Sequence, residues 1–316
     1  MSDLCLVTGG GGFIGSHLAE ALTAQGQRVR VLDNFSTGLR ENLAHIRPAP
    51  EIVVGDVADP EAVGRAVAGV SLVFHLAALA SVQFSVENPA ASQRACDTGT
   101  LHVLDAARRA GVRRLVYAGS SSAYGVPSRE VQTEDEPLRP LSPYAAAKLA
   151  GELYAEAFAV TYGLETVRVR FFNVFGPRQR ADSPYSGVIA LFTAAMTQRR
   201  APTVFGDGLQ SRDFVYVTDA VQALIRASTV PGVSGKVYNI GTGRRITVLD
   251  LVAALNRQLG TSLSPQHGPP RAGDVRHSCA DIRRAQKELG YQPRVPFEEG
   301  LADTLRWYRE SAALAS

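Results

Sequence analysis

A tyrosine and a lysine, Tyr144 and Lys148, stand four residues apart in the alanine-rich stretch SPYAAAKLAGELYAEAF. If this stretch is helical, the two side chains emerge on one face, one turn apart. A phenol alone is a poor base because its pKa in water is about 10, but an ammonium group and a positively charged nicotinamide ring would both stabilise the phenolate. The spacing therefore suits proton transfer. The alternative is an amphipathic helix with a packed tyrosine and a solvated lysine.

Three serines favour the chemical interpretation of this pair. Ser120, Ser121 and Ser122 stand in GSSSAYG, at the end of a preceding predicted strand. A parallel sheet binds its ligands at that edge, so the three hydroxyls can reach the same substrate oxygen as the tyrosine. For any one of these serines, capping of a turn stays an open alternative.

A glycine-rich turn predicts a dinucleotide site. VTGGGGFIGSHLAEAL spaces Gly9, Gly12 and Gly15 three residues apart between a strand and a helix. Glycines let a pyrophosphate approach bare backbone, and the helix N-terminus supplies amide donors. Asp33 ends the second strand, where a carboxylate accepts the ribose hydroxyls and repels a 2′-phosphate, so NAD is favoured over NADP. A glycine-rich turn without a ligand is the alternative, but here the full context of the motif is met.

The elements that would position these residues alternate along the first half of the chain. Strands are expected at 4–8, 28–33, 51–56, 72–77, 113–120 and 165–172, and helices at 13–25, 89–110 and 143–162. Strands that are apolar on both faces predict an α/β fold with a Rossmann-type doubly wound parallel sheet. Further helices are expected at 188–200, 248–259 and 282–289, with a strand at 213–217.

Two units are expected. Residues 1–172 would form an NAD-binding Rossmann domain, with a returning segment near 213–240. Residues 173–212 and 241–316 would form a smaller C-terminal α+β lobe that binds the substrate.

Composition excludes several functions. Lys+Arg total 33 and Asp+Glu 30, for a net charge of +3, and the basic residues are scattered, so nucleic acid is not expected as a partner. Cys5, Cys96 and Cys279 are far apart, which fits a reducing compartment and predicts neither a disulfide framework nor a metal site. No leader or membrane-spanning stretch is evident, and a cytoplasmic protein without membrane contact is expected.

The opening T-G-G-x-G-F-I-G, the turn S-S-S-x-Y-G, the Y-x-x-x-K pair and a later N-V-F-G-P-R-Q together resemble the extended short-chain dehydrogenase/reductase superfamily, and within it the NAD-dependent nucleotide-sugar 4-epimerases. The resemblance covers nearly the whole chain. It implies that Tyr144 is the catalytic base, assisted by Ser120 and Lys148. It also implies an NAD site made of Gly9, Gly12, Phe13, Ile14, Gly15, Asp33, Asn34, Ser36, Thr37, Gly38, Asp56, Val57, Leu76, Ala77, Ala78, Tyr144, Lys148 and Phe171.

The same resemblance implies a UDP-sugar substrate that is epimerised at C4 through a transient 4-keto intermediate. Arginines suit this role because guanidinium groups bind phosphate oxygens in pairs. The implied substrate residues are Ser121, Ser122, Asn173, Gln179, Gly187, Val188, Thr203, Val204, Phe205, Arg212, Arg271, Asp274 and Ser278.

The sugar is less fixed than the reaction. Ser278 stands where a bulky tyrosine would narrow the pocket, which leaves volume for an N-acetyl group, and the chain most resembles bacterial UDP-N-acetylglucosamine 4-epimerases. UDP-glucose stays open as a substrate, and so does UDP-glucuronate, whose carboxylate would need a cation such as Arg178 or Arg180. Related 4,6-dehydratases and decarboxylases carry an acid in the serine turn, which Ser121 and Ser122 cannot replace.

One departure stands out. Relatives usually have N-x-x-G-T where this chain has Cys96 to Thr100, and a thiol cannot make the hydrogen bonds of an amide. His75 is expected to be a strand-end histidine rather than an acid. A non-catalytic NAD-binding sensor or scaffold is the alternative from another class, against which the intact Ser120, Tyr144 and Lys148 argue. Relatives commonly pair through helices like 89–110 and 142–162, so the resemblance implies a homodimer.

Overall fold

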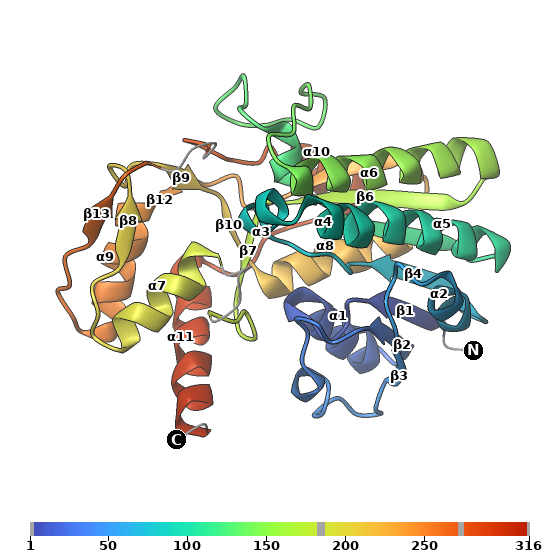
Figure 1. Cartoon of the computed structure of the whole chain (residues 1–316), viewed down its shortest axis with the longest axis horizontal. Helices are drawn as coiled ribbons and strands as arrows, with labels where there is room; N and C mark the ends of the chain where they lie inside the picture. Colours follow the sequence, from blue (N-terminus) through green and yellow to red (C-terminus); the bar gives the residue numbers. More distant parts are fainter. Residues whose placement is uncertain (1–2, 182–186, 271–274, 315–316) are drawn as a thin grey trace.

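The computed structural model describes residues 3–181, 187–270 and 275–314. Its centre is a seven-stranded parallel sheet in the order β11-β6-β5-β4-β1-β2-β3 (Figure 1). The strands are β1 (Leu4–Thr8), β2 (Arg28–Asp33), β3 (Glu51–Val54), β4 (Leu72–His75), β5 (Arg114–Ser120), β6 (Glu165–Phe171) and β11 (Lys236–Ile240). The strand order reverses between β1 and β4, which is the point where Rossmann-type sheets bind dinucleotides. The expected fold class is confirmed.

Helices cover both faces of the sheet, which is why its strands are apolar on both sides. Leu6 packs on one face with Val73 and Phe158, whereas its neighbour Val7 packs on the other with Leu18. The second face is covered by α1 (Phe13–Ala24), α8 (Val217–Thr229) and α10 (Arg283–Leu289). The first is covered by α2 (Pro60–Val67), α5 (Gly99–Arg109) and α6 (Pro143–Tyr162), with α3 (Val82–Glu87) and α4 (Pro89–Gln93) beside α6.

The expected helix over 89–110 is interrupted. A π-turn, η2 (Arg94–Thr98), lies between α4 and α5, and the Gly99 N–H at its end donates to the carbonyl of Arg94, five residues back. Cys96, the residue that departs from the family pattern, is inside this turn and is fully buried. Short 3₁₀ turns occur at η1 (Arg40–Asn42) and η3 (Ser121–Tyr124).

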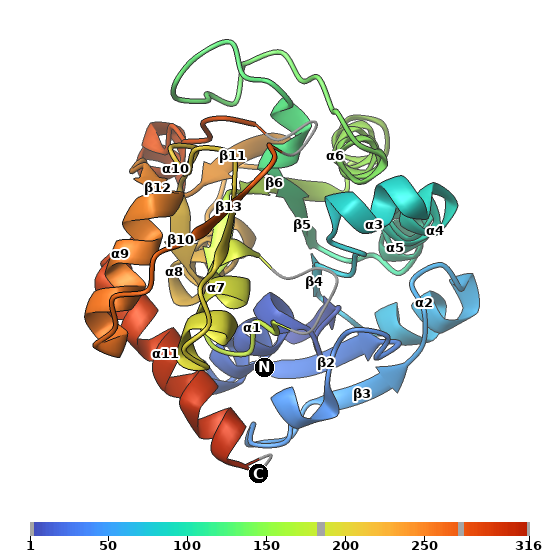
Figure 2. The ribbon, with the colours of Figure 1, turned by 60° about the vertical axis from the view of Figure 1, so that its left-hand side comes forward.

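The smaller lobe has its own core, around Phe175, Phe214, Leu251 and Leu255. Figure 2 views the molecule from the side of this lobe. Three two-stranded sheets pair β7 (Asn173–Phe175) with β10 (Phe214–Tyr216), β8 (Thr203–Phe205) with β13 (Gln266–Gly268), and β9 (Ser211–Arg212) with β12 (Ile246–Thr247). Its helices are α7 (Val188–Thr197), α9 (Val248–Leu259) and α11 (Phe297–Leu314).

The chain returns from this region to the main sheet twice, the second time with α10, which packs on β11 and α8. The segment after β10 forms α8, which packs on α1, and then β11, which pairs with β6. The strand expected over 213–217 is shorter than predicted, because Val217 already opens α8. In the described part of the chain, no helix has both the length and the apolar character to span a membrane.

Candidate active site

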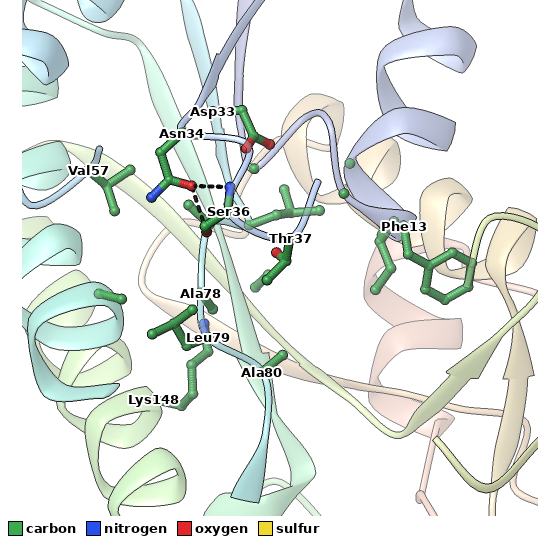
Figure 3. Close-up of a pocket in the computed structure, with 18 of the residues that line it drawn as sticks. Phe13, Asp33, Asn34, Ser36, Thr37, Val57, Ala78, Leu79, Ala80 and Lys148 are labelled. Carbon is green, nitrogen blue, oxygen red and sulfur yellow. Dashed lines mark hydrogen bonds between the residues drawn. The ribbon is translucent and has the colours of Figure 1, made fainter. Parts of the chain in front are cut away.

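A cavity of about 720 Å³ lies along the edge of the sheet where β1, β2, β4, β5 and β6 end. Figure 3 shows Asp33, Asn34, Ser36 and Thr37 at one part of its wall, with Ala78, Leu79, Ala80 and Lys148 at another. Most of the residues expected to bind NAD line this cavity. They are Gly9, Gly12, Phe13, Ile14, Gly15, Asp33, Asn34, Ser36, Thr37, Asp56, Val57, Leu76, Ala77, Ala78, Tyr144, Lys148 and Phe171.

Gly38 is the exception, because it does not line the cavity. Its backbone packs against the glycine turn instead, and a Cβ on Gly38 would lie 2.8 Å from the carbonyl carbon of Gly11. Gly38 thus helps the turn to close, and a direct contact with the cofactor is not supported.

The glycine turn has room for backbone and ligand but not for side chains. A Cβ on Gly15 would lie 2.2 Å from the carbonyl oxygen of Gly9, and Gly9 itself has φ +71°. No side chain caps the N-terminus of α1 at Gly12, and its first turn holds no acidic residue. The amide groups at this helix end therefore suit the pyrophosphate of a dinucleotide.

Asp33 is oriented by two backbone donors. Its side chain accepts the Gly11 N–H at 2.8 Å and the Phe35 N–H at 2.7 Å. Burial raises the pKa of this carboxyl group, although the two hydrogen bonds oppose the shift. Next to it, the Asn34 side-chain oxygen accepts hydrogen bonds from the backbone and the hydroxyl of Ser36 (Figure 3). A ribose with free hydroxyls fits this acceptor-rich wall.

Tyr144 and Lys148 both face the cavity from the first two turns of α6. The helix begins at Pro143, where the Ser142 hydroxyl accepts the N–H of Ala145. Burial raises the pKa of Tyr144 above its ordinary range, and a hydrogen bond with Ser120 opposes this shift. Tyr144 and Lys148 therefore lie on one face of α6, as the sequence spacing predicts.

The side chain of Lys148 is buried and lies over the ring of Tyr117. Its Nζ lies 4.4 Å from the centre of the Tyr117 ring, and the Tyr117 hydroxyl donates to the Lys148 carbonyl at 2.9 Å. Burial lowers the pKa of Lys148 to about 8, while nearby Cys96 and Glu152 act in the opposite direction. The ammonium group is thus held in a site where its charge acts strongly on its neighbours.

Only one of the three serines lines the cavity. Ser120, the last residue of β5, is in the wall, and its hydroxyl lies 2.8 Å from that of Ser122. Ser121 and Ser122 open the η3 turn outside the lining residues. Ser120 therefore lies in the cavity wall with Tyr144, whereas Ser121 and Ser122 belong to the turn that follows Ser120.

Among the described residues that are expected to bind the substrate, Gln179 alone is in the wall of this cavity. Asn173 is held by Asp213, whose carbonyl accepts both its backbone and side-chain N–H groups. Gly187 caps α7 at Val188, and a Cβ on Gly187 would lie 3.3 Å from the Gln179 amide nitrogen.

The β8 and β9 residues form a separate surface of the lobe. Val204 is 1% exposed and its side chain packs in the lobe core, so its expected role in substrate binding would fall to its backbone. Its neighbours Thr203 and Phe205 are more exposed. Arg212 donates to the carbonyls of Ser211 and Arg276.

Two of the expected substrate residues, Arg271 and Asp274, lie outside the described residues. Ser278 is described, and its backbone N–H donates to the carbonyl of Ser211. Ser278 does not line the cavity, so the argument from its size is not supported by the cavity wall.

Several lining residues escaped the sequence reasoning. Arg178 was named only for a possible uronate, yet it lines the cavity with φ +67° and donates to Glu20 at 2.6 Å. Arg180 also lines the cavity. Arg94 and Ala95 belong to the π-turn, and no local signal predicts that this turn faces a ligand. Leu79 and Ala80 follow directly on the predicted Leu76–Ala78 run, so extension of that run would have found them.

Comparison with known proteins agrees with this geometry. The model of the NAD dependent epimerase/dehydratase family matches residues 5–241. The chain belongs to this family. It is 40% identical over 311 residues to UDP-glucose 4-epimerase of Mycolicibacterium smegmatis, covering 97% of this chain and 99% of that protein.

Solved structures of family members have the same fold. UDP-glucose 4-epimerase from Thermotoga maritima, solved with UDP-glucose, superposes with a TM-score of 0.93 at 39% identity, over 98% of this chain and 99% of that one. UDP-N-acetylglucosamine 4-epimerase from Methanobrevibacter ruminantium M1, solved with UDP-N-acetylmuramic acid, has a TM-score of 0.93 at 35% identity over the same shares. Proteins named as dTDP-glucose 4,6-dehydratase and as UDP-N-acetyl-alpha-D-glucosaminuronate decarboxylase also match. The protein is thus an NAD-dependent enzyme of the nucleotide-sugar-modifying type.

Proposed function

We propose that this protein interconverts the C4 epimers of a UDP-hexose. The observation that supports the proposal best is that Ser120, Tyr144 and Lys148 converge on the cavity that the glycine turn and Asp33 prepare for NAD. A cofactor site and a proton-transfer group in one enclosed space are what an oxidation at a sugar hydroxyl requires.

In the proposed reaction, Tyr144 accepts the proton of the sugar 4-hydroxyl, and Ser120 donates a hydrogen bond to the same oxygen. Bound NAD supplies a reversible hydride acceptor and a positive charge. That charge and the Lys148 ammonium both favour the phenolate, which burial alone disfavours. The 4-keto sugar then turns its other face before reduction, so the nucleotide has to be held more firmly than the sugar.

The residues of the serine turn distinguish the neighbouring reactions. Elimination of water or loss of a carboxyl group needs an acid–base residue near C5 or C6 in addition to the tyrosine. The stretch Ser120 to Gly125 holds no carboxylate. This absence favours an epimerase over the dehydratases and decarboxylases of the same family.

Relatives that act on UDP-glucose and on UDP-N-acetylglucosamine support these two sugars. One of the two candidate cations for a uronate, Arg178, is already paired with Glu20 and lies 3.1 Å from a ring nitrogen of His45. Arg180, the other, also lines the cavity, so UDP-glucuronate stays the second candidate substrate. The relatives named above favour a neutral hexose, with or without an N-acetyl group, as the first candidate. Arg212, which lies on β9 of the small lobe, would bind the uridine diphosphate, and Arg271 is proposed for the same role from the sequence alone.

Proton NMR of the protein incubated separately with UDP-glucose, UDP-N-acetylglucosamine and UDP-glucuronate tests this proposal. A new anomeric signal of the 4-epimer is expected in the first two tubes and not in the third. The Tyr144→Phe variant should lose this activity but keep NAD, whereas Tyr154→Phe, a change at an exposed position of the same helix, should keep both. A sensor or scaffold would show no conversion in any tube.

A homodimer is also proposed. Leu153 and Val160, two turns apart on one face of α6, leave large apolar side chains exposed, with exposed Tyr154 beside them, and burial of this face against a second copy would remove them from water. A Leu153→Glu and Val160→Glu double variant should shift the sedimentation coefficient to that of a single chain. A wild-type protein that sediments as a monomer would contradict the proposal.

A further inference from the structure

Behind Lys148, three buried polar side chains form a continuous chain of hydrogen bonds. The Thr8 hydroxyl lies 2.7 Å from Nδ1 of His75, and Nε2 of His75 lies 2.9 Å from the Thr100 hydroxyl. The Thr100 hydroxyl in turn lies 2.5 Å from the Cys96 carbonyl oxygen. Thr8, His75 and Thr100 each have 0% exposure, so a missing partner is not replaced by bulk water.

The Cys96 carbonyl at one end of this chain decides which groups donate and which accept. A carbonyl can only accept, so Thr100 donates its one hydroxyl proton to Cys96 and must accept from His75. His75 then carries its proton on Nε2, and its bare Nδ1 accepts the hydroxyl proton of Thr8. The ring stays neutral, because burial and the charge of Lys148 lower the pKa of His75 to about 3.

The other end of the chain reaches the wall of the cavity. The Thr8 hydroxyl oxygen accepts the backbone N–H groups of Leu76 and Ala77, both at 3.2 Å. Leu76 and Ala77 line the cavity beside the glycine turn, and a Cβ on Gly9 would lie 2.9 Å from the Ala77 backbone. The chain thus starts at the floor of the proposed NAD site.

The Cys96 carbonyl belongs to the π-turn, which packs against α6. Residues of this turn share the cavity wall with Lys148, namely Arg94 and Ala95. A π-turn is a strained insertion in a helix and often occurs at functional sites. A threonine hydroxyl that bonds the carbonyl four residues back loosens a helix in the same place. Without this bond, the segment has no evident reason to keep the wider turn.

We propose that Thr8, His75 and Thr100 are positioning residues that fix the π-turn, and with it the wall around Lys148, relative to the floor of the cofactor site. The proposal rests on the proposed function only for its effect on turnover. The effects on cofactor binding and on the histidine follow from the geometry alone.

Loss of this hydrogen-bond chain should therefore affect both the cofactor site and the reaction. If the chain is broken at Thr100, the His75 N–H and the Cys96 carbonyl lose the hydroxyl that links them. The π-turn can then return to a regular helix. Its hydrogen-bond register would shift by one residue, and Arg94, Ala95 and Cys96 would turn about the helix axis relative to Lys148. Both NAD affinity and the pH profile of turnover should respond.

Nitrogen-15 NMR of the histidine side chains in the NAD-bound wild-type protein is the first test. His75, assigned by comparison with the His75→Gln variant, is expected to be neutral with its proton on Nε2 at pH 7. A proton on Nδ1, or a mixture of the two tautomers, overturns the proposed chain even if the threonine variants fail to fold.

The second test compares Thr100→Val with Thr100→Ser. The valine variant keeps the shape but loses the hydroxyl, and is expected to weaken NAD binding by roughly tenfold, to shift the pH profile of turnover, and to alter the His75 tautomer. The serine variant should restore all three to near wild-type values. Thr304→Val is the matched control, because the Thr304 hydroxyl makes the same bond to the carbonyl four residues back at 0% exposure, but in α11.

Three results are decisive. Unchanged NAD affinity and an unchanged histidine spectrum in folded Thr100→Val overturn the proposal. So does a Thr304→Val variant that loses NAD affinity equally, because the effect is then one of general stability. If wild-type protein converts no UDP-sugar but the NAD and histidine results are as expected, the positioning role stands and the proposed function fails.

Discussion

Glu152 and Arg170 form an ion pair whose two side chains are each 3% exposed. Glu152 is one turn beyond Lys148 on α6, and Arg170 is on β6, with distances of 2.5 and 3.0 Å between their paired atoms. The same guanidinium donates to the Tyr124 hydroxyl at 2.8 Å. Tyr124 closes the η3 turn that follows Ser120. One arginine therefore fixes both the helix of Tyr144 and Lys148 and the turn beside Ser120.

Glu152→Gln is expected to destabilise the protein by about 3 kcal/mol. Loss of one partner leaves the Arg170 charge buried without compensation, and this costs far more than the intact pair contributes. The free energy of unfolding in urea measures the effect. Asp105→Asn is the control, because Asp105 pairs with Arg108 and Arg109 on the surface of α5, and its loss should cost about 1 kcal/mol or less. Equal losses in the two variants would contradict this account of Arg170.

Turnover should decline above about pH 8, where Lys148 loses its proton. Burial lowers the pKa of Lys148 from 10.5 to about 8, so the ammonium form that favours the Tyr144 phenolate is present below that pH. The free energy of unfolding should instead rise with pH between 8 and 10.5, because in this range the unfolded chain binds a proton that the folded chain does not. A profile of kcat/KM against pH measures the decline. Lys148→Arg should be slower but should lack this limb, because a guanidinium stays charged.

Asp33→Asn should lower the preference for NAD over NADP. The amide keeps an acceptor for one backbone N–H but removes the charge that repels a 2′-phosphate, and NAD binding should weaken by roughly tenfold as a charged hydrogen bond is lost. Calorimetric titration with both cofactors measures the ratio. Asp56→Asn removes a carboxylate from the same wall and should not change that ratio. If Asp33→Asn weakens NADP as much as NAD, then Asp33 does not face the 2′ position.

The sequence predicts those parts of the fold whose signals are local. Strands Leu4–Thr8 and Arg28–Asp33 have the expected bounds, because apolar runs between glycine and polar residues define them. Helix α8 lies inside the expected returning segment but was not itself predicted, since its pattern runs directly on from the strand before it. Helix α11, which follows α10 through a short loop, was not predicted either.

Features that depend on distant residues were not predictable. The stretch Arg94 to Thr98 contains no helix breaker. The carbonyl of Cys96 in the π-turn accepts the Thr100 hydroxyl, which in turn bonds His75 on the distant strand β4. Glu152 could equally have been a solvated residue on α6, because only the position of Arg170 on β6 buries it. Likewise, Asp33 and the glycine turn could be placed in the site from one βαβ unit, whereas the substrate residues come from segments that no local pattern relates to each other.

Stability should fall below pH 6.5 because two histidines are kept neutral in the fold. The pKa of His75 is lowered to about 3, by burial and then by the charge of Lys148. The pKa of His17 is lowered to about 4, by burial and then by the charge of Arg178. The unfolded chain binds a proton on each group near pH 6.5, and the folded chain does not, so each costs about 1.4 kcal/mol per pH unit below that value.

The variants His17→Gln and His75→Gln separate the two contributions. Both should be less stable than wild type at pH 7, since each histidine makes internal hydrogen bonds, but each should reduce the slope of stability against pH between 6 and 5 by about one proton. Below about pH 4 the His17 contribution ends, so only His75→Gln should still differ in slope from wild type. Urea unfolding at half-unit steps of pH measures these slopes. A His75→Gln variant with the wild-type slope would mean that the imidazole is protonated in the fold, which its bond from Thr8 does not allow.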